Sequence, residues 1–107
     1  MSTAPRPQPT AQDRVNLDPK HYAVELENER VRVLRITYGP HEKSVMHGHP
    51  SVVTVNLTDA HLKFTYHDGK TEIIEARAGQ VLSFPAFENL PENLSDKPYE
   101  AIAIELK

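Results

Sequence analysis

Two histidines separated by a single glycine, His47-Gly48-His49, are the residues of this chain best suited to chemistry. They follow the turn signal Gly39-Pro40 and precede a valine-rich segment that favours a β-strand. Side chains at positions i and i+2 of a strand project from the same face, so both imidazoles could enter one cavity. Two neutral imidazoles can share a metal ion, whereas a protonated one can bind a carboxylate or a phosphate. The spacing predicts a site and leaves both chemistries open.

The remaining histidines are expected to lie outside this site. His61 and His67 alternate with apolar side chains along one predicted strand, so we expect them to face solvent. His21 and His41 stand in charged, turn-like surroundings, and His41 would reach the site only if the loop at Gly39 folded over its mouth. The candidate site therefore depends on the spaced pair.

Composition excludes several kinds of site and partner. The chain of 107 residues contains no cysteine, which excludes disulfides, thiolate zinc sites and cysteine nucleophiles. The formal net charge is -3 and the 12 lysines and arginines are scattered, which argues against nucleic-acid binding. No apolar run approaches the roughly 20 residues of a membrane span, and the amino terminus lacks the pattern of a signal peptide. We therefore expect a cytoplasmic protein with no nucleic-acid or membrane partner.

The chain is expected to divide into a tail and one domain. Residues 1–15 are rich in proline and polar side chains, which bury too little apolar surface to offset ordering, so we expect a flexible tail. Strand and turn signals dominate residues 16–107, and Asp68-Gly69 predicts a tight hairpin turn. The expected strands cover residues 22–27, 31–38, 51–57, 62–66, 71–76, 81–84 and 99–106, with residues 85–98 as a polar connection interrupted by proline. The fold class is therefore all-β, a sandwich or a closed barrel.

The order of these signals resembles the two motifs of the cupin superfamily. Gly39-Pro40, the histidine pair, a β-hairpin, Gly79 with Pro85 after five intervening residues, Glu92-Asn93 and a final strand follow one another over about residues 23–107. The resemblance implies a small β-barrel of the jelly-roll type, commonly a homodimer. It also implies a small-molecule or metal site inside the barrel.

The first motif matches the metal-binding cupins only in part. In those proteins it supplies two histidines and a glutamate, and the resemblance assigns His47 and His49 to the two histidines. The glutamate would fall at Val53 or Thr54, and neither carries a carboxylate. The implied cofactor, one divalent ion of Fe, Mn, Ni or Zn, would therefore lack a ligand.

The second motif also departs from the family pattern. Its histidine would fall at Asn89 or Leu90, depending on whether the count starts from Asn93 or from Pro85. An amide oxygen at Asn89 is a weak ligand for a transition metal. A one-residue bulge could turn Glu88 inward and complete a site of two histidines and one carboxylate. Phe87, which stands where many relatives have glycine, is expected beside the site.

Three functions are compatible with this pattern. The first is a small cupin-like barrel that binds a small organic or anionic ligand, with a degenerate metal site and a pocket formed by His47, His49, Phe87 and Asn89. The alternative is a mononuclear metal-dependent enzyme, a dioxygenase or an isomerase acting on a small organic acid, as the resemblance suggests. The third is an interaction protein that uses a barrel edge to dimerise. Catalytic residues are not assigned, because no nucleophile motif or phosphate-binding loop is present.

Overall fold

The protein consists of strands and one short helix over the residues described, 12–107, in a computed structural model. The helix is α1 (Arg14–Leu17). The strands are β1 (Tyr22–Glu27), β2 (Val31–Tyr38), β3 (His47–His49), β4 (Val52–Asn56), β5 (Ala60–Thr65), β6 (Thr71–Ala76), β7 (Val81–Phe84), β8 (Phe87–Asn93) and β9 (Tyr99–Leu106). The predicted all-β class is therefore confirmed.

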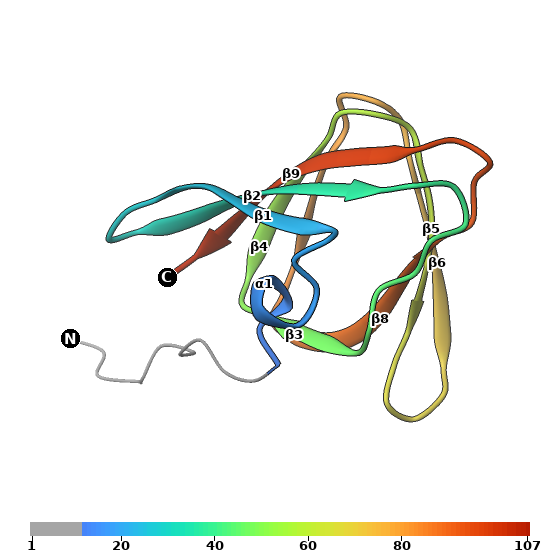
Figure 1. The fold of residues 1–107 in the computed structure, drawn as a ribbon, viewed down its shortest axis with the longest axis horizontal. Helices are drawn as coiled ribbons and strands as arrows, with labels where there is room; N and C mark the ends of the chain where they lie inside the picture. The colour runs from blue at the N-terminus through green and yellow to red at the C-terminus, as the bar shows by residue number, and fades with distance from the viewer. Residues whose placement is uncertain (1–11) are drawn as a thin grey trace.

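The strands form two sheets whose inner faces enclose the core (Figure 1). One sheet has the order β1-β2-β9-β4-β7 and the other has the order β3-β8-β5-β6. Every pair of neighbouring strands is antiparallel, and sequential strands repeatedly fall in different sheets. The chain therefore passes back and forth between the two walls, which is how a jelly roll encloses an interior. The core side chains include Leu34, Ile36, Val52, Leu62, Phe64, Ala101 and Ala103.

The hairpin predicted at Asp68-Gly69 is present, and the strands predicted over residues 22–27 and 31–38 form a second hairpin. Strands β1 and β2 pair across the turn at residues 28–30, where the side chain of Asn28 accepts hydrogen bonds from the backbone N–H groups of Arg30 and Val31. Strands β5 and β6 pair across a turn in which Gly69 has a φ of 84°. This left-handed backbone conformation is accessible to glycine at little cost, so the sequence signal had a direct physical basis.

The prediction of a polar connection over residues 85–98 is wrong for half of that segment. Residues 87–93 form β8, which lies between β3 and β5 in the four-stranded sheet. Pro91 is buried within this strand, and its carbonyl accepts a hydrogen bond from the backbone N–H of Ser44 at 2.9 Å. Proline lacks an N–H donor and is therefore usually a signal against a central strand.

Strands β4 and β9 of the five-stranded sheet direct mostly small or polar side chains inward. On β4 the buried residues are Val52, Thr54 and Asn56, whereas Val53 and Val55 face the other side. On β9 the buried residues are Tyr99, Ala101, Ala103 and Glu105, and the isoleucines lie between them on the other face. The inward placement of these polar side chains makes the interior partly polar, as a binding site requires.

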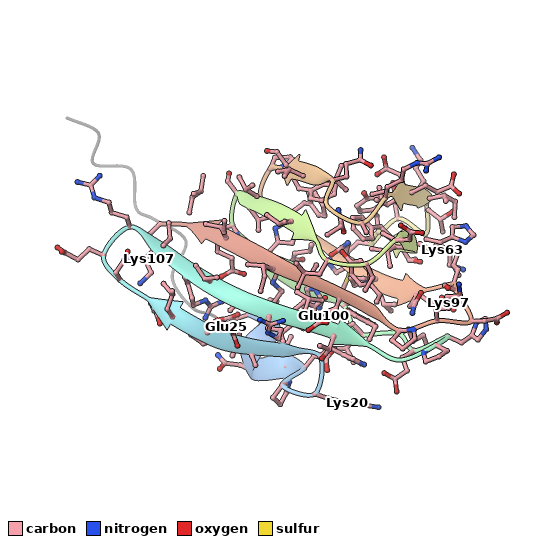
Figure 2. The ribbon with its side chains drawn as sticks, turned by 90° about the horizontal axis from the view of Figure 1, so that it is seen from above. Lys20, Glu25, Lys63, Lys97, Glu100 and Lys107 are labelled. Carbon is pink, nitrogen blue, oxygen red and sulfur yellow. The ribbon has the colours of Figure 1, made fainter. Side chains whose placement is uncertain are left out.

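The outer face of this sheet combines apolar side chains with surface ion pairs. Arg35 on β2 binds Glu100 on β9 at 2.6 Å and Glu25 on β1 at 3.3 Å. Figure 2 looks onto this face and shows Glu25 and Glu100 on β1 and β9. The glutamates of β1 are exposed on this edge strand, where charge discourages unwanted strand pairing.

The segment before the barrel is packed against it from residue 12 onward. The side chain of Asp13 caps α1 by accepting a hydrogen bond from the backbone N–H of Val15, and the carbonyl of Gln12 accepts one from Gly48 on β3. Asp13 and Arg14 are buried, so the predicted flexible tail of residues 1–15 extends too far. Residues 1–11 lie outside the described residues. Between residues 12 and 107, no helix has the length and apolar character needed to cross a membrane.

Candidate functional site

A cavity of about 50 Å³ lies between the two sheets. Roughly 10–15 Å³ of such space holds one water molecule, so the cavity accommodates a ligand of only a few non-hydrogen atoms. Its wall combines apolar side chains, three tyrosines and a small polar group. The polar group is formed by Arg14, His47, His49, Thr54, Asn89 and Glu92, and the tyrosines are Tyr22, Tyr38 and Tyr99.

Strands β3 and β8 position the histidine pair. His47 lies directly across from Asn89, and His49 lies directly across from Phe87. The intervening Gly48 faces the other side, where an added Cβ would lie 3.3 Å from Cγ of Glu88. His47 and His49 therefore both line the cavity, and Asn89 lies beside them on the same inward face.

A chain of hydrogen bonds fixes the proton of His47. Ser44 donates its single hydroxyl hydrogen to Oδ2 of Asp18, at an O–O distance of 2.5 Å. Oγ of Ser44 lies 3.1 Å from Nδ1 of His47, so it must accept the hydrogen from that nitrogen. Nε2 therefore carries the lone pair of a neutral imidazole. Burial, with the positive charge of Arg14 next in size, lowers the pKa of His47 to about 3.

His49 is held in the same tautomer by a different group. Its Nδ1 donates to the backbone carbonyl of Pro50 at 2.7 Å, which leaves Nε2 unprotonated. The ring of Phe87 packs against it, with the centroids 4.5 Å apart. Burial and the charge of Arg14 lower the pKa of His49 to about 4. The site therefore presents two neutral imidazoles at neutral pH.

The short helix α1, which lies beside β3 in Figure 1, contributes an arginine to the cavity wall. Nε of Arg14 donates to Oε2 of Glu105 at 2.9 Å, while Oε1 of Glu105 accepts from Nε of Arg32 at 2.8 Å. Arg32 also forms two parallel hydrogen bonds with Asp13, at 2.8 and 2.9 Å. These four residues make a buried charge network that holds α1 against the barrel. The network fixes the Arg14 guanidinium, whose central carbon lies 4.9 Å from the ring centroid of Tyr22.

Three buried polar atoms have no hydrogen-bond partner within the described part of the chain. They are Nη2 of Arg14, Nε2 of His47 and Oδ1 of Asn89, and all three residues line the same cavity. The residues are 5%, 0% and 1% exposed. An unsatisfied buried donor or acceptor costs about 1–3 kcal/mol, so three at one place require an explanation. A polar ligand between them would satisfy both the donor and the acceptors.

The structure distinguishes the alternatives that the sequence left open for the missing metal ligands. Thr54 is buried and lines the cavity, whereas Val53 faces the other side of β4. Asn89 is buried across from His47, whereas its neighbour Leu90 is only partly buried and does not line the cavity. The inward positions of both motifs are therefore occupied by Thr54 and Asn89.

Two other expected site residues lie elsewhere. Glu88 is exposed on the outer side of β8, where one of its carboxylate oxygens lies 2.6 Å from Nε2 of His67. It therefore does not turn inward to join the histidine pair. Phe87 packs against the ring of His49 and against the core, and it is not part of the cavity wall.

The donor set does not fit a tightly bound transition metal. Two neutral imidazoles and one amide oxygen supply no negative charge, and the nearby guanidinium of Arg14 repels a cation. Glu92, the carboxylate in the wall, lies 3.7 Å from the ammonium of Lys63 and forms no metal group with the two histidines among residues 12–107. Among residues 12–107 no group of three or more histidine, aspartate or glutamate side chains is close enough to hold an ion. The residues that the cupin resemblance assigned to a metal therefore form a polar site of a different kind.

The remaining histidines lie away from the cavity. His61 and His67 are exposed, as predicted, and His41 is exposed and bound to Asp96. His21 is buried, which its charged, turn-like surroundings did not indicate. Its Nδ1 lies 2.7 Å from Asp18, and its ring stacks on Tyr38 at a centroid distance of 4.2 Å.

Sequence reasoning missed the residues that orient the site. Arg14 fell within the predicted tail, and no motif in the sequence singled out Ser44 or Asp18. A signal for Ser44 did exist, because it precedes His47 by three residues and can reach the ring. Asp13 before a helical turn was a capping signal, which could have placed Arg14 in an ordered segment.

Comparison with known proteins supports the assignment of the fold. No family model and no curated protein matches this chain. Among solved structures, a cupin domain from Bordetella pertussis Tohama I is 26% identical and has a TM-score of 0.74, with coverage of 80% of this chain and 91% of its own. An RmlC-like cupin family protein with a double-stranded β-helix fold, from Methanocaldococcus jannaschii, is 19% identical, with a TM-score of 0.62 and coverage of 83% of each chain.

A larger enzyme contains a similar unit. An oxalate decarboxylase from Bacillus subtilis is 13% identical, with a TM-score of 0.59 and coverage of 75% of this chain but only 22% of its own. These matches agree with two antiparallel sheets that enclose the histidine pair. The chain therefore has the fold of the small cupins, a double-stranded β-helix, and its described residues hold an incomplete set of the metal ligands implied by the cupin resemblance.

Proposed function

We propose that this cupin binds a small organic acid in its interior. The observation that carries the proposal is that three buried polar atoms without partners, from Arg14, His47 and Asn89, belong to residues that line one cavity. A carboxylate would accept a hydrogen bond from Nη2 of Arg14, and bonds from charged donors are stronger than those between neutral groups. The cavity volume of about 50 Å³ restricts the acid to a few non-hydrogen atoms.

The arrangement of Arg14 supports an anion over a cation. Its Nε is engaged by Glu105, which fixes the planar guanidinium and leaves Nη2 without a partner. Glu105 shares its charge with Arg32, so the cavity keeps a cationic donor without a free carboxylate from this network. A metal-dependent dioxygenase or isomerase would need the carboxylate and the third imidazole that this donor set lacks. Binding of an acid therefore has more support than metal-dependent catalysis.

Replacement of Arg14 by lysine tests the proposal. We expect the parent to bind acetate. The affinity of Arg14→Lys for acetate is expected to be lower by about tenfold or more, because a single ammonium group cannot bind Glu105 and a ligand in the cavity at the same time. Isothermal titration calorimetry with sodium acetate measures the effect. Arg30→Lys is the matched control, since Arg30 is exposed in the turn after β1. Thermal denaturation of each variant verifies folding.

Two results would contradict the proposal. The parent could fail to bind acetate, formate and glycolate, in which case the unpartnered atoms have no acid ligand. Alternatively, Arg14→Lys and Arg30→Lys could have equal affinities for acetate, in which case Arg14 does not contact the anion. A folded Arg14→Lys variant with weakened acetate binding supports the proposal.

Homodimer formation stays a prediction of the cupin resemblance. We expect the full chain in solution to have a molar mass of about twice the 12.1 kDa of one copy. Size-exclusion chromatography with light scattering measures this mass directly. A mass of one copy at all accessible concentrations would contradict the expectation.

A further inference from the structure

We propose that the bound acid carries a hydroxyl group on the carbon next to its carboxylate, an inference that rests on the acid-binding function proposed above. The carboxylate meets Nη2 of Arg14, and the hydroxyl donates to the acceptor pair formed by Nε2 of His47 and Oδ1 of Asn89. The ligand class is therefore a short 2-hydroxy acid. The inference follows from the direction in which each hydrogen bond of the site must run.

His47 requires a donor from the ligand. Ser44 gives its hydrogen to Asp18 and accepts the one on Nδ1 of His47, so the lone pair of Nε2 remains unused. A carboxylate, which has only acceptor atoms, cannot satisfy this lone pair. A simple acid such as acetate would leave Nε2 without a partner.

Asn89 adds a second acceptor at the same place. It lies directly across from His47 in the β3–β8 register, and its Oδ1 is also unpartnered. Side chains in such a cross-strand pair have Cβ atoms about 4.5–5.5 Å apart, so one donor group between them can reach both acceptors. Three-centre hydrogen bonds of this kind are common in proteins.

Arg14 and His47 lie against the same tyrosine of the cavity wall. Both contact the ring of Tyr22: the central carbon of Arg14 lies 4.9 Å from the ring centroid, and the His47 ring centroid lies 5.1 Å from it. The cationic donor and the neutral acceptor therefore both lie beside Tyr22 at the wall of one cavity. A ligand that carries an acceptor and a donor on adjacent carbons matches this arrangement in a cavity of about 50 Å³.

A hydroxyl fits the donor position better than an ammonium group. The cavity wall already contains the guanidinium of Arg14, and the carboxylate of Glu105 is shared between Arg14 and Arg32. Glu92 also belongs to the cavity wall, and one of its carboxylate oxygens lies 3.7 Å from Nζ of Lys63, which partly offsets its charge. A second buried cation would therefore enter without a free counter-charge, whereas a neutral hydroxyl carries no such penalty.

Calorimetric titration of the full chain with acetate, glycolate and glycine tests the inference. These probes share a carboxylate and differ in the neighbouring group, which is a methyl hydrogen, a hydroxyl or an ammonium. We expect glycolate to bind about tenfold more tightly than acetate, because it satisfies an otherwise unpartnered acceptor. Glycine is expected to bind no more tightly than acetate.

Ser44→Ala tests the role of Ser44 as a positioning residue. The variant removes the group that fixes the hydrogen on Nδ1 of His47, so we expect the preference for glycolate over acetate to fall several-fold. Acetate affinity is expected to change little, because Arg14 is unaltered. Nitrogen-15 NMR of the His47 ring is expected to report a mixture of tautomers in Ser44→Ala and a single tautomer in the parent. Ser83→Ala, at an exposed position of β7, is the matched control.

The outcomes separate this inference from the proposed function. Equal binding of acetate and glycolate, with both weakened in Arg14→Lys, would overturn the hydroxyl inference and leave acid binding in place. Tighter binding of glycine than of glycolate would also overturn it, in favour of an ammonium donor. Absence of binding by all three probes would overturn both. A glycolate preference that Ser44→Ala reduces and Ser83→Ala preserves supports the inference.

Discussion

The double variant Thr54→Glu/Asn89→His is expected to bind one divalent transition-metal ion per chain, although the parent donor set does not fit one. Thr54 and Asn89 are buried residues of the cavity wall, on opposite sheets. The glutamate and the histidine introduced at these positions would join the imidazoles of His47 and His49. Nε2 of each imidazole is already unprotonated, which is the state that metal ligation requires. The added glutamate also offsets the charge of Arg14. Three histidines and one carboxylate form a ligand set that suits Fe, Mn, Ni or Zn.

Elemental analysis of untagged protein after dialysis against each metal measures this gain. The matched control is Val53→Glu/Leu90→His, which adds the same two side chains at neighbouring positions outside the cavity wall. We expect near-stoichiometric metal and a metal-dependent rise in Tm for the first variant alone. Equal metal content in the two double variants would mean that the cavity does not organise the ligands.

Loss of Glu105 is expected to destabilise the fold more than the loss of any surface acid. Glu105→Ala leaves Arg14 and Arg32 without their shared carboxylate, and Glu105 itself is only 2% exposed. Removal of one partner from a buried ion pair costs about 3–5 kcal/mol, because it leaves uncompensated buried charge. We therefore expect the free energy of unfolding to fall by about this amount in urea titrations monitored by circular dichroism.

Glu100→Ala is the control on the same strand. Its carboxylate binds Arg35 at 2.6 Å, but both side chains are about two-fifths exposed, at 40% and 38%. Exposed ion pairs contribute about 0–1 kcal/mol, so this variant should be close to the parent in stability. Equal losses for Glu105→Ala and Glu100→Ala would show that the buried network does not hold α1 to the barrel.

The local signals in the sequence predicted most of the strands but not the path of β8. Alternation and turn residues located the two hairpins because those signals act over a few residues. Strand β8 was missed because Pro85 and Pro91 indicated a loop. Its position depends on pairing with β3 and β5, which are distant in the chain. Such pairing has no local signature around residue 91.

The sequence pattern also did not indicate which face of β9 points into the interior. On β9, isoleucines alternate with alanines and Glu105, and a purely hydrophobic criterion would turn the isoleucines inward. The structure buries Ala101, Ala103 and Glu105 instead. Glu105 is tolerated in the interior because Arg14 and Arg32 neutralise its charge. Only the three-dimensional contacts reveal that compensation.

The candidate site could be predicted in its position but not in its chemistry. The spacing of His47 and His49 indicated a shared face, and both residues line the cavity. The cationic donor and the Ser44–Asp18 relay come from segments outside the two motifs, so motif counting could not find them. The charge of the site was therefore the part that the sequence left undetermined.

The location of Arg14 on α1 has an evolutionary consequence. The imidazoles and Asn89 come from the sheets, but the guanidinium is carried by a single helical turn that precedes the first strand. Substitutions in that turn could change the charge offered to a guest molecule while the barrel architecture is retained. Substitutions in the few codons that encode this turn would therefore alter the polar side of the cavity wall and leave the strands unchanged.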